Sequence, residues 1–363
     1  MEMSVKERWS AAVDMQPVDR LPFWPKLDGA YPPAQIIPFR NMNMDAIHKW
    51  IGSDNHIWVS ACIKEVHHNT SCTDETGDGS RRRIFRTPIG ECEERTQFDA
   101  ASNSWHPIMP PVQTLEDIKI MIAYYENLTA EVNTGAVEQA KAAVDSYGDG
   151  AFVGAAVGGS PLMRWVEWLA GVENAHLLLE DHQDEVETLF QAMHKLLLRE
   201  VEIASENCPA DILYLIEDTS TTTISPTQFD TYCVKHIRDY GDIAVSMKRR
   251  LALHTCGHLK ALLPSMSRLP VVGFEAFTSP PVGNTSLLDG RTACPDKCLI
   301  GGSNAALWTQ SAEKIIEQIE RDLDKLPHHR GVVLTSGGVM PPIARPETIR
   351  TVCEWVKRYQ VRS

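Results

Sequence analysis

The chain has 363 residues, of which 43% are hydrophobic and 23% charged, and its formal net charge is −13. This length and apolar content are enough for a large core, and the charged fraction is ordinary for a folded protein. The acidic balance argues against a nucleic-acid-binding surface and against docking on anionic lipid. The nine cysteines are odd in number and scattered, which suits reduced thiols in a cytoplasm better than a disulfide framework.

The opening stretch, MEMSVKERWSAAVDM, has no apolar core followed by a small-residue cleavage site, so we do not expect a signal peptide. No uninterrupted apolar run approaches the roughly 20 residues that a membrane helix needs. We therefore expect a cytoplasmic protein that binds neither membrane nor nucleic acid.

Eight short apolar runs recur along the chain, and most are followed by an amphipathic stretch. They are RLPFWP (20–25), HIWVSACI (56–63), AFVGAA (151–156), ILYLIED (212–218), RLALHTC (250–256), VVGFEAF (271–277), CLIGGSN (298–304) and GVVLTSG (331–337). Near-continuous apolar runs without alternation are typical of parallel strands that are covered on both faces.

Helical periodicity fills the gaps between these runs. Apolar positions recur at three-four spacing over residues 174–207, 311–326 and 345–359. In ISPTQF, Ser225 suits an N-cap, Pro226 the first helical turn and Gln228 the returning side chain of a capping box.

The segment from about 64 to 110 breaks this alternation. Its RRRIFRTPIGECEERTQF (81–98) alternates and turns at Pro88–Gly90, which predicts a hairpin in a small β insertion. We therefore expect an α/β fold: a (β/α)₈ TIM barrel with an N-terminal helical extension and this insertion, in a single domain over residues 1–363. A doubly wound open sheet would show a similar alternation.

In such a barrel the active site is built at the carboxyl ends of the strands. The candidate residues at these ends are Trp24, Lys26, Glu217, Asp218, His254, Cys256, Glu275, Asn304 and Ser336. Glu217 and Asp218 would either bind a cationic or hydroxylated substrate or cap the next helix.

His254 and Cys256 lie two apart on an extended segment, so their side chains point to one side. Thiolate and imidazole suit Zn²⁺, and Glu275 ends the next predicted strand, about 5 Å away in a parallel sheet. A site of these three residues would leave one coordination position open, as catalytic zinc requires. Equally, Cys256 can be a small buried hydrophobe and His254 a hydrogen-bonded core residue, because His-x-Cys alone is a weak motif.

Six segments, taken in order, resemble the uroporphyrinogen decarboxylase-like superfamily over nearly the whole chain. They are PVDRLPFWP, ISPTQFDTY, LHTCGH, GFEAFTSPPVG, LIGGSN and VVLTSGGVMPPIARPETIR. The resemblance implies a (β/α)₈ barrel. The decarboxylase proper holds substrate carboxylates with an arginine-rich N-terminal motif, whereas the matching WPKLDGAYPP (24–33) contains no arginine.

The other branch of the superfamily is similar to methylcobamide:coenzyme M methyltransferase and works with a corrinoid protein. Its members carry a His-x-Cys zinc motif on the fifth strand, which His254 and Cys256 match. In the related cobalamin-independent methionine synthases, a glutamate at the end of the next strand is also a ligand, which Glu275 would match. Both groups place a further cysteine on the last strand, where this chain has Ser336 in LTSGGVMPP.

The resemblance thus implies a zinc-dependent methyltransferase that exchanges a methyl group between a small methylated substrate and the cobalamin of a corrinoid protein. The missing last-strand cysteine favours O-demethylation, with a methoxylated aromatic as the leading donor. The substrate-binding candidates are Trp24, Lys26, Glu217, Asp218, Asn304 and Ser336.

Two other functions stay open. One is a metal-free uroporphyrinogen decarboxylase-like lyase, for which Lys26 is the available strand-end cation. The other is a binding module that kept the barrel and lost the chemistry. The sequence is compatible with a homodimer and does not specify the oligomeric state.

Overall fold

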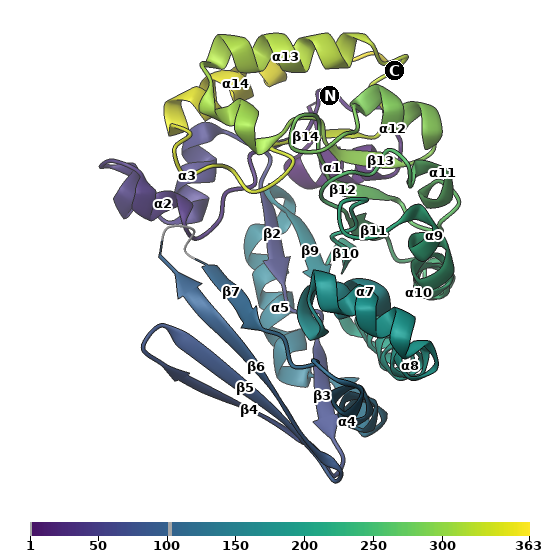
Figure 1. Ribbon diagram of the computed structural model, residues 1–363. Helices are drawn as coiled ribbons and strands as arrows, with labels where there is room; N and C mark the ends of the chain where they lie inside the picture. The colour runs from purple at the N-terminus through teal and green to yellow at the C-terminus, as the bar shows by residue number, and fades with distance from the viewer. Residues whose placement is uncertain (1, 101–103) are drawn as a thin grey trace.

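The computed structural model describes residues 2–100 and 104–363. Eight parallel strands form one sheet that curls into a nearly closed barrel with helices around it (Figure 1). The strands are β1 (Phe23–Trp24), β2 (His56–Val59), β9 (Phe152–Ala156), β10 (Ile212–Ile216), β11 (Leu251–His254), β12 (Gly273–Phe277), β13 (Cys298–Gly301) and β14 (Val332–Thr335). Each strand lies inside one of the eight predicted runs, so the predicted (β/α)₈ architecture is confirmed.

The barrel has a seam between its first two strands. The strand order is β1-β14-β13-β12-β11-β10-β9-β2, so that β1 lies beside β14. No ladder joins β1 to β2 among the described residues, and the backbone hydrogen bond from Asp54 N to Phe23 O, 2.8 Å long, crosses the seam.

Asp54, which is fully buried, ties the N-terminal helix α1 (Val5–Val13) to this seam. Arg8 Nη1 donates to Asp54 Oδ1 at 2.6 Å, and Arg20 Nη1 donates to Oδ2 at 2.6 Å. The backbone N–H of Phe23 also donates to Oδ2, at 3.0 Å. Such charge-assisted bonds are stronger than neutral ones, so the predicted N-terminal extension helps to close the barrel.

A cluster of large side chains fills the barrel interior. Trp9 of α1 packs there with Trp24 and with His56, whose ring stacks on Trp24 at a centroid distance of 4.5 Å. His56 Nε2 lies 3.1 Å from the hydroxyl of Tyr214. Gly154 leaves the room that this pair needs, because a Cβ there would lie 2.7 Å from the imidazole and 2.8 Å from the phenol ring. The interior is therefore filled, and a site has to lie above it, at the strand ends.

A second and larger apolar cluster lies between the barrel and its outer helices. These helices include α3 (Met44–Ile51), α4 (Leu115–Glu126), α5 (Thr134–Tyr147), α7 (Val172–Asp181), α8 (Gln183–Asn207), α10 (Val234–Ser246), α12 (Leu287–Ala293), α13 (Ala312–Asp324) and α14 (Pro346–Arg358). The shorter ones are α2 (Tyr31–Ala34), α6 (Pro161–Arg164), α9 (Pro226–Gln228) and α11 (Leu263–Met266).

The helix predicted over 174–207 is two helices, which meet at His182. The predicted capping box of Ser225 and Gln228 is present at the start of α9. In the part of the chain that the structure describes, no helix combines the length and the apolar character needed to cross a membrane.

The predicted β insertion leaves the barrel after β2 and stands at the carboxyl-terminal end of the strands (Figure 1). β3 (Ile63–His67) pairs with β8 (Leu128–Val132), and a four-stranded antiparallel sheet contains β4 (Ser71–Gly77), β5 (Ser80–Thr87), β6 (Gly90–Asp99) and β7 (Ser104–Met109). The predicted turn at Pro88–Gly90 joins β5 to β6.

Candidate active site

The imidazole of His254, at the end of β11, lies between two carboxylates. Its Nε2 is 2.9 Å from Asp218 Oδ1, and its Nδ1 is hydrogen-bonded to Glu275 Oε2. The thiol of Cys256 lies 3.0 Å from the same Asp218 oxygen. The ligand atoms of Asp218, His254 and Cys256 are all within 4.8 Å of one another. The structure thus brings two of the predicted metal ligands together with a residue predicted to bind substrate.

The acidic pair that follows β10 separates in space. Asp218 has a φ of +38°, which is uncommon for a residue other than glycine, and its N–H donates to His254 O at 3.0 Å. Glu217 turns to Ser160 instead, where its Oε1 accepts from the backbone N–H at 2.6 Å and its Oε2 from the hydroxyl at 2.7 Å. Burial raises the pKa of Glu217 to about 7. Only Asp218 therefore contributes to the group around His254.

Glu275 is fully buried near the end of β12, where the pairing with β13 is irregular. The next residue, Ala276, has a φ of +59°, and strained positions of this kind cluster at functional sites. Lys26 Nζ donates to Glu275 Oε1 at 2.7 Å, while Oε2 is bonded to His254 Nδ1. Burial opposes ionisation of Glu275, but Lys26 and His254 hold its pKa at about 2. Glu275 is therefore a carboxylate with a partner for each oxygen.

The groups around His254 favour the protonated, positively charged form of its imidazole. Burial alone would lower the pKa of His254, but its hydrogen bonds to Asp218, Cys256 and Glu275 raise it to about 11. Thiolate, imidazole and carboxylate are the ligands that Zn²⁺ takes in proteins. The observed spacings of 2.9 and 3.0 Å are hydrogen-bond contacts, which would have to lengthen to the roughly 3.3–3.7 Å between ligands of one tetrahedral ion with bonds of about 2.0–2.3 Å. The chemistry of the donor set fits zinc.

Trp24 lies deeper than the other predicted site residues. It is 3% exposed and stacks on His56, inside the barrel. The ammonium group of Lys26 is 5.8 Å from the Trp24 ring centroid. Trp24 thus forms the floor below the Lys26–Glu275 ion pair.

Asn304 and Ser336 are buried and bonded to the protein. Asn304 donates to Ser279 Oγ at 3.0 Å, and its side-chain oxygen accepts from the backbone N–H of Leu307 at 3.0 Å. Ser336 donates to Gly338 O at 2.5 Å. These bonds shape the loops at the mouth, and contact of either residue with substrate stays a prediction.

Two residues at the mouth were not among the predicted site residues. Glu167 belongs to a π-helical turn, η3 (Trp165–Leu169), which a pattern of period 3.6 does not reveal. Burial, followed by the charges of Asp218 and Glu217, raises the pKa of Glu167 to about 8, so the turn lies within electrostatic reach of the site. Trp58, at the mouth end of β2, is 44% exposed although its strand is largely apolar.

Comparison with known proteins gives one family and one shared fold. Among solved structures, a methyltransferase from Methanosarcina mazei aligns with a TM-score of 0.62 over 98% of this chain and 99% of that chain, at 15% sequence identity. A D-psicose 3-epimerase, solved in the presence of D-fructose, aligns over 66% of this chain and 84% of that chain, at 11% identity, and its TM-score of 0.35 is too low to carry an argument.

The likeness to the archaeal methyltransferase shows a common fold, because the sequence identity is low. No curated protein sequence matches the chain. The family model "Uroporphyrinogen decarboxylase (URO-D)" matches residues 107–359, which is well over half of the chain. The chain therefore belongs to the uroporphyrinogen decarboxylase (URO-D) family.

Proposed function

We propose that the protein is a zinc-dependent methyltransferase, which moves a methyl group between a small methylated substrate and the cobalamin of a separate corrinoid protein. The observation that carries this proposal is the donor set of Asp218, His254 and Cys256 at the carboxyl ends of β10 and β11. The fold shared with an archaeal methyltransferase supports it.

In this proposal the metal ligands are His254 through Nε2, Cys256 and Asp218. The sequence predicted Glu275 as the third ligand, whereas both of its oxygens have partners in the structure, Lys26 and His254. A carboxylate bonded to Nδ1 of a ligating histidine fixes the tautomer and the ring orientation. We therefore assign this orienting role to Glu275 and the ligand role to Asp218.

Bound zinc would supply Lewis acidity to the oxygen or sulfur from which the methyl group leaves, or to which it moves. Glu275 would keep one proton of His254 on Nδ1, and Nε2 would have to give up the other proton for its lone pair to bind the metal. Lys26 balances the charge of Glu275, and Trp24 closes the space beneath them. The last strand offers Ser336 in place of a cysteine, which favours O-demethylation with a methoxylated aromatic as donor.

A metal-free lyase of the decarboxylase type is less well supported. It would need a free cation at the strand ends to hold a substrate carboxylate. Lys26, the predicted cation, is bonded to Glu275 at 2.7 Å and is therefore not free.

The experiment combines the zinc-loaded enzyme with the corrinoid protein encoded nearest to its gene, reduced to the cob(I)alamin state. Methoxylated aromatics, methanol, methylamines and glycine betaine are offered in turn as donors. We expect one of them to produce methylcob(III)alamin, followed by absorbance. Cys256→Ser should abolish the reaction, and Cys72→Ser, in the distant strand β4, should retain it. Absence of transfer in either direction, with thiol and folate acceptors included, would contradict the proposal.

A further inference from the structure

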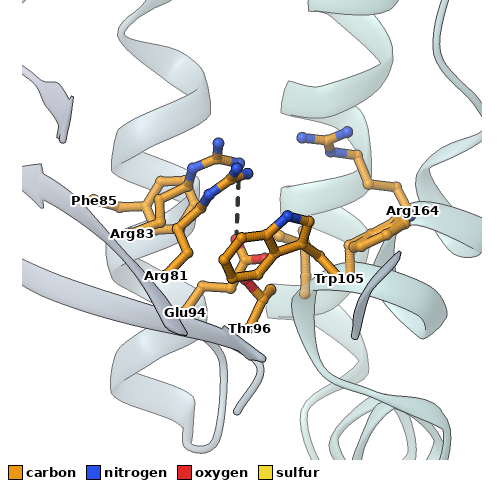
Figure 2. Close-up of a pocket in the computed structure, with 9 residues that line it drawn as sticks. Arg81, Arg83, Phe85, Glu94, Thr96, Trp105 and Arg164 are labelled. Atoms are coloured by element: carbon orange, nitrogen blue, oxygen red, sulfur yellow. Dashed lines mark ion pairs between the residues drawn. The ribbon is translucent and has the colours of Figure 1, made fainter. Parts of the chain in front are cut away.

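A cavity of about 270 Å³ lies beside the barrel mouth, between the sheet of the β insertion and the segment that follows β9 (Figure 2). Strands β5, β6 and β7 form one wall, and α6 with η3 forms the other. Three arginines and three aromatic residues line it: Arg81, Arg83, Arg164, Phe85, Trp105 and Trp168. It is therefore separate from the group around His254.

The alternation of β5 sorts its arginines between two faces. Arg81 and Arg83 point into the cavity, whereas Arg82 points to the opposite face of the sheet. On that opposite face Arg82 is 3.3 Å from Glu75 and is bonded to Glu93. The charge of Arg82 is thus neutralised by its neighbours.

The arginines on the cavity face are not all neutralised in this way. Arg81 stacks over Trp105, with 4.8 Å between its guanidinium carbon and the ring centroid, and it has no ion pair among the described residues. Arg83 makes two bonds to Asp74, of 2.7 and 3.0 Å, and lies 3.9 Å from Glu94. Burial raises the pKa of Glu94, the one carboxylate in the lining of the cavity, and so disfavours its negative charge.

Arg164 supplies a third guanidinium from the other wall. Its Nε donates to the Tyr125 hydroxyl at 2.9 Å, and within the described ranges no carboxylate pairs with it. In Figure 2 the guanidinium group of Arg164 points across the cavity toward those of Arg81 and Arg83. Arg81 and Arg164, neither in an ion pair among the described residues, thus face a cavity whose lining carboxylate is Glu94, while Arg83 is paired with Asp74.

Apolar and polar groups complete the cavity. Trp105, Phe85 and Trp168 offer ring faces and edges, and Trp168 is 46% exposed. Thr96 also lines the cavity, and its buried hydroxyl lacks a hydrogen-bond partner in the described part of the chain. Such a hydroxyl is free to bond a polar group of a ligand.

We propose that this cavity binds a small aromatic carboxylate, with its ring against Trp105 and Trp168 and its carboxylate facing Arg81 and Arg164. Guanidinium groups bind carboxylates through paired hydrogen bonds and also stack on aromatic rings. The volume lies just below the range of about 300–1,000 Å³ of drug-sized ligand sites, which suits one substituted ring and excludes a corrinoid. The site does not depend on methyl transfer.

The test measures binding of benzoate to the full chain by calorimetry and by tryptophan fluorescence, with benzamide as the neutral analogue. Benzoate should saturate the protein, and benzamide should bind at least about tenfold more weakly, because a bond to a charged group is worth about 1.5–3 kcal/mol. Arg81→Gln should weaken benzoate binding by a similar factor. Arg82→Gln removes the same charge from the opposite face of the same strand and should leave binding unchanged.

Three results would overturn the site: no saturable benzoate binding, equal affinity for benzamide, or an equal loss in Arg82→Gln. If Arg81→Gln does not fold, as judged by circular dichroism, Arg164→Lys provides the same test, because it keeps the charge and loses the planar fork. The assay contains no cobalamin and no methyl donor. A failure of the proposed methyl transfer therefore does not affect the benzoate result, and a failure of benzoate binding does not affect the proposed methyl transfer.

Discussion

The ammonium group of Lys26 lies 2.7 Å from Oε1 of Glu275, although the two residues are 249 positions apart in the chain. Lys26 follows β1 and Glu275 belongs to β12, and β14 and β13 lie between these strands in the sheet. The ion pair therefore spans the mouth of the barrel. It also fixes the carboxylate that holds the ring of His254.

Lys26→Met should destabilise the protein, because it leaves the buried Glu275 carboxylate without its cation. Breaking a buried ion pair costs about 3–5 kcal/mol, measured here as the change in the free energy of unfolding in urea. The double variant Lys26→Met/Glu275→Gln should recover part of this loss. The exposed pair of Lys119 and Glu116 is the control, and Lys119→Met should change stability by less than about 1 kcal/mol. Equal effects of Lys26→Met and Lys119→Met would show that the spanning pair is not structural.

Protein purified without added metal or chelating resin should contain close to one zinc per chain, measured by plasma mass spectrometry. Cys256→Ser should lose it, because a serine hydroxyl stays protonated near neutral pH, and Asp218→Asn should bind it much more weakly. Glu275→Gln should keep zinc with an affinity reduced about 10–100-fold, as expected for a residue that orients a ligand. Cys72→Ser is the control.

Full zinc occupancy in Cys256→Ser would remove the site. Complete zinc loss in Glu275→Gln together with normal zinc binding by Asp218→Asn would restore Glu275 as the third ligand, as the sequence predicted.

Stability should fall in acid because of His56. Burial is the main influence on this imidazole, and it lowers the pKa to about 3 despite the nearby charge of Glu275. The unfolded chain takes up the proton below pH of about 6.5, whereas the folded protein does not, so the unfolded state binds more protons. The stabilisation is thus complete above that pH and is lost as the pH falls toward 3, at about 1.4 kcal/mol per pH unit.

The check is the slope of unfolding free energy against pH between about 6.5 and 4. His56→Phe should reduce this slope, and the buried His48, whose pKa burial lowers to about 4, accounts for part of the remainder. An unchanged slope in His56→Phe would mean that the His56 ring is accessible to protons in the folded state.

Gly154→Ala should destabilise the barrel interior. The added methyl group would lie 2.7 Å from the His56 ring and 2.8 Å from the Tyr214 ring, and overpacking of this kind costs about 1–3 kcal/mol. Gly150→Ala is the matched control, because a Cβ there would meet nothing within 4 Å. Equal urea midpoints for the two variants would contradict a tightly filled interior.

The sequence predicted the strands well because each one is an apolar run, and the strand ends followed from the runs. It predicted that His254, Cys256 and Glu275 meet, but it did not predict that Asp218 joins them. The backbone of Asp218 has a positive φ, and its carboxylate lies beside His254 and Cys256. The side chain of its neighbour Glu217 is bonded to Ser160 instead. That separation depends on backbone geometry, which residue spacing does not encode.

The cavity of the β insertion shows the same limit. Alternation along β5 is enough to place Arg81 and Arg83 on one face and Arg82 on the other. Arg164, however, reaches the cavity from a wall that follows β9, and no local pattern connects it to β5. Contacts between segments that lie far apart in the chain could be recognised only in the folded structure.

The seam between β1 and β2 has a consequence for the order of events on the ribosome. β1 pairs with β14 through Phe23 and Leu334, and it has no ladder to β2 among the described residues. A strand made near the start of synthesis therefore has no strand partner until residue 334 has left the exit tunnel. Until then α1 and Asp54 hold this segment near β2 through the bonds of the Asp54 carboxylate and through one backbone bond, from Asp54 N to Phe23 O. We expect the nascent barrel to remain sensitive to proteases up to that point, because β1 and β13 lack the strand that joins them until β14 is added.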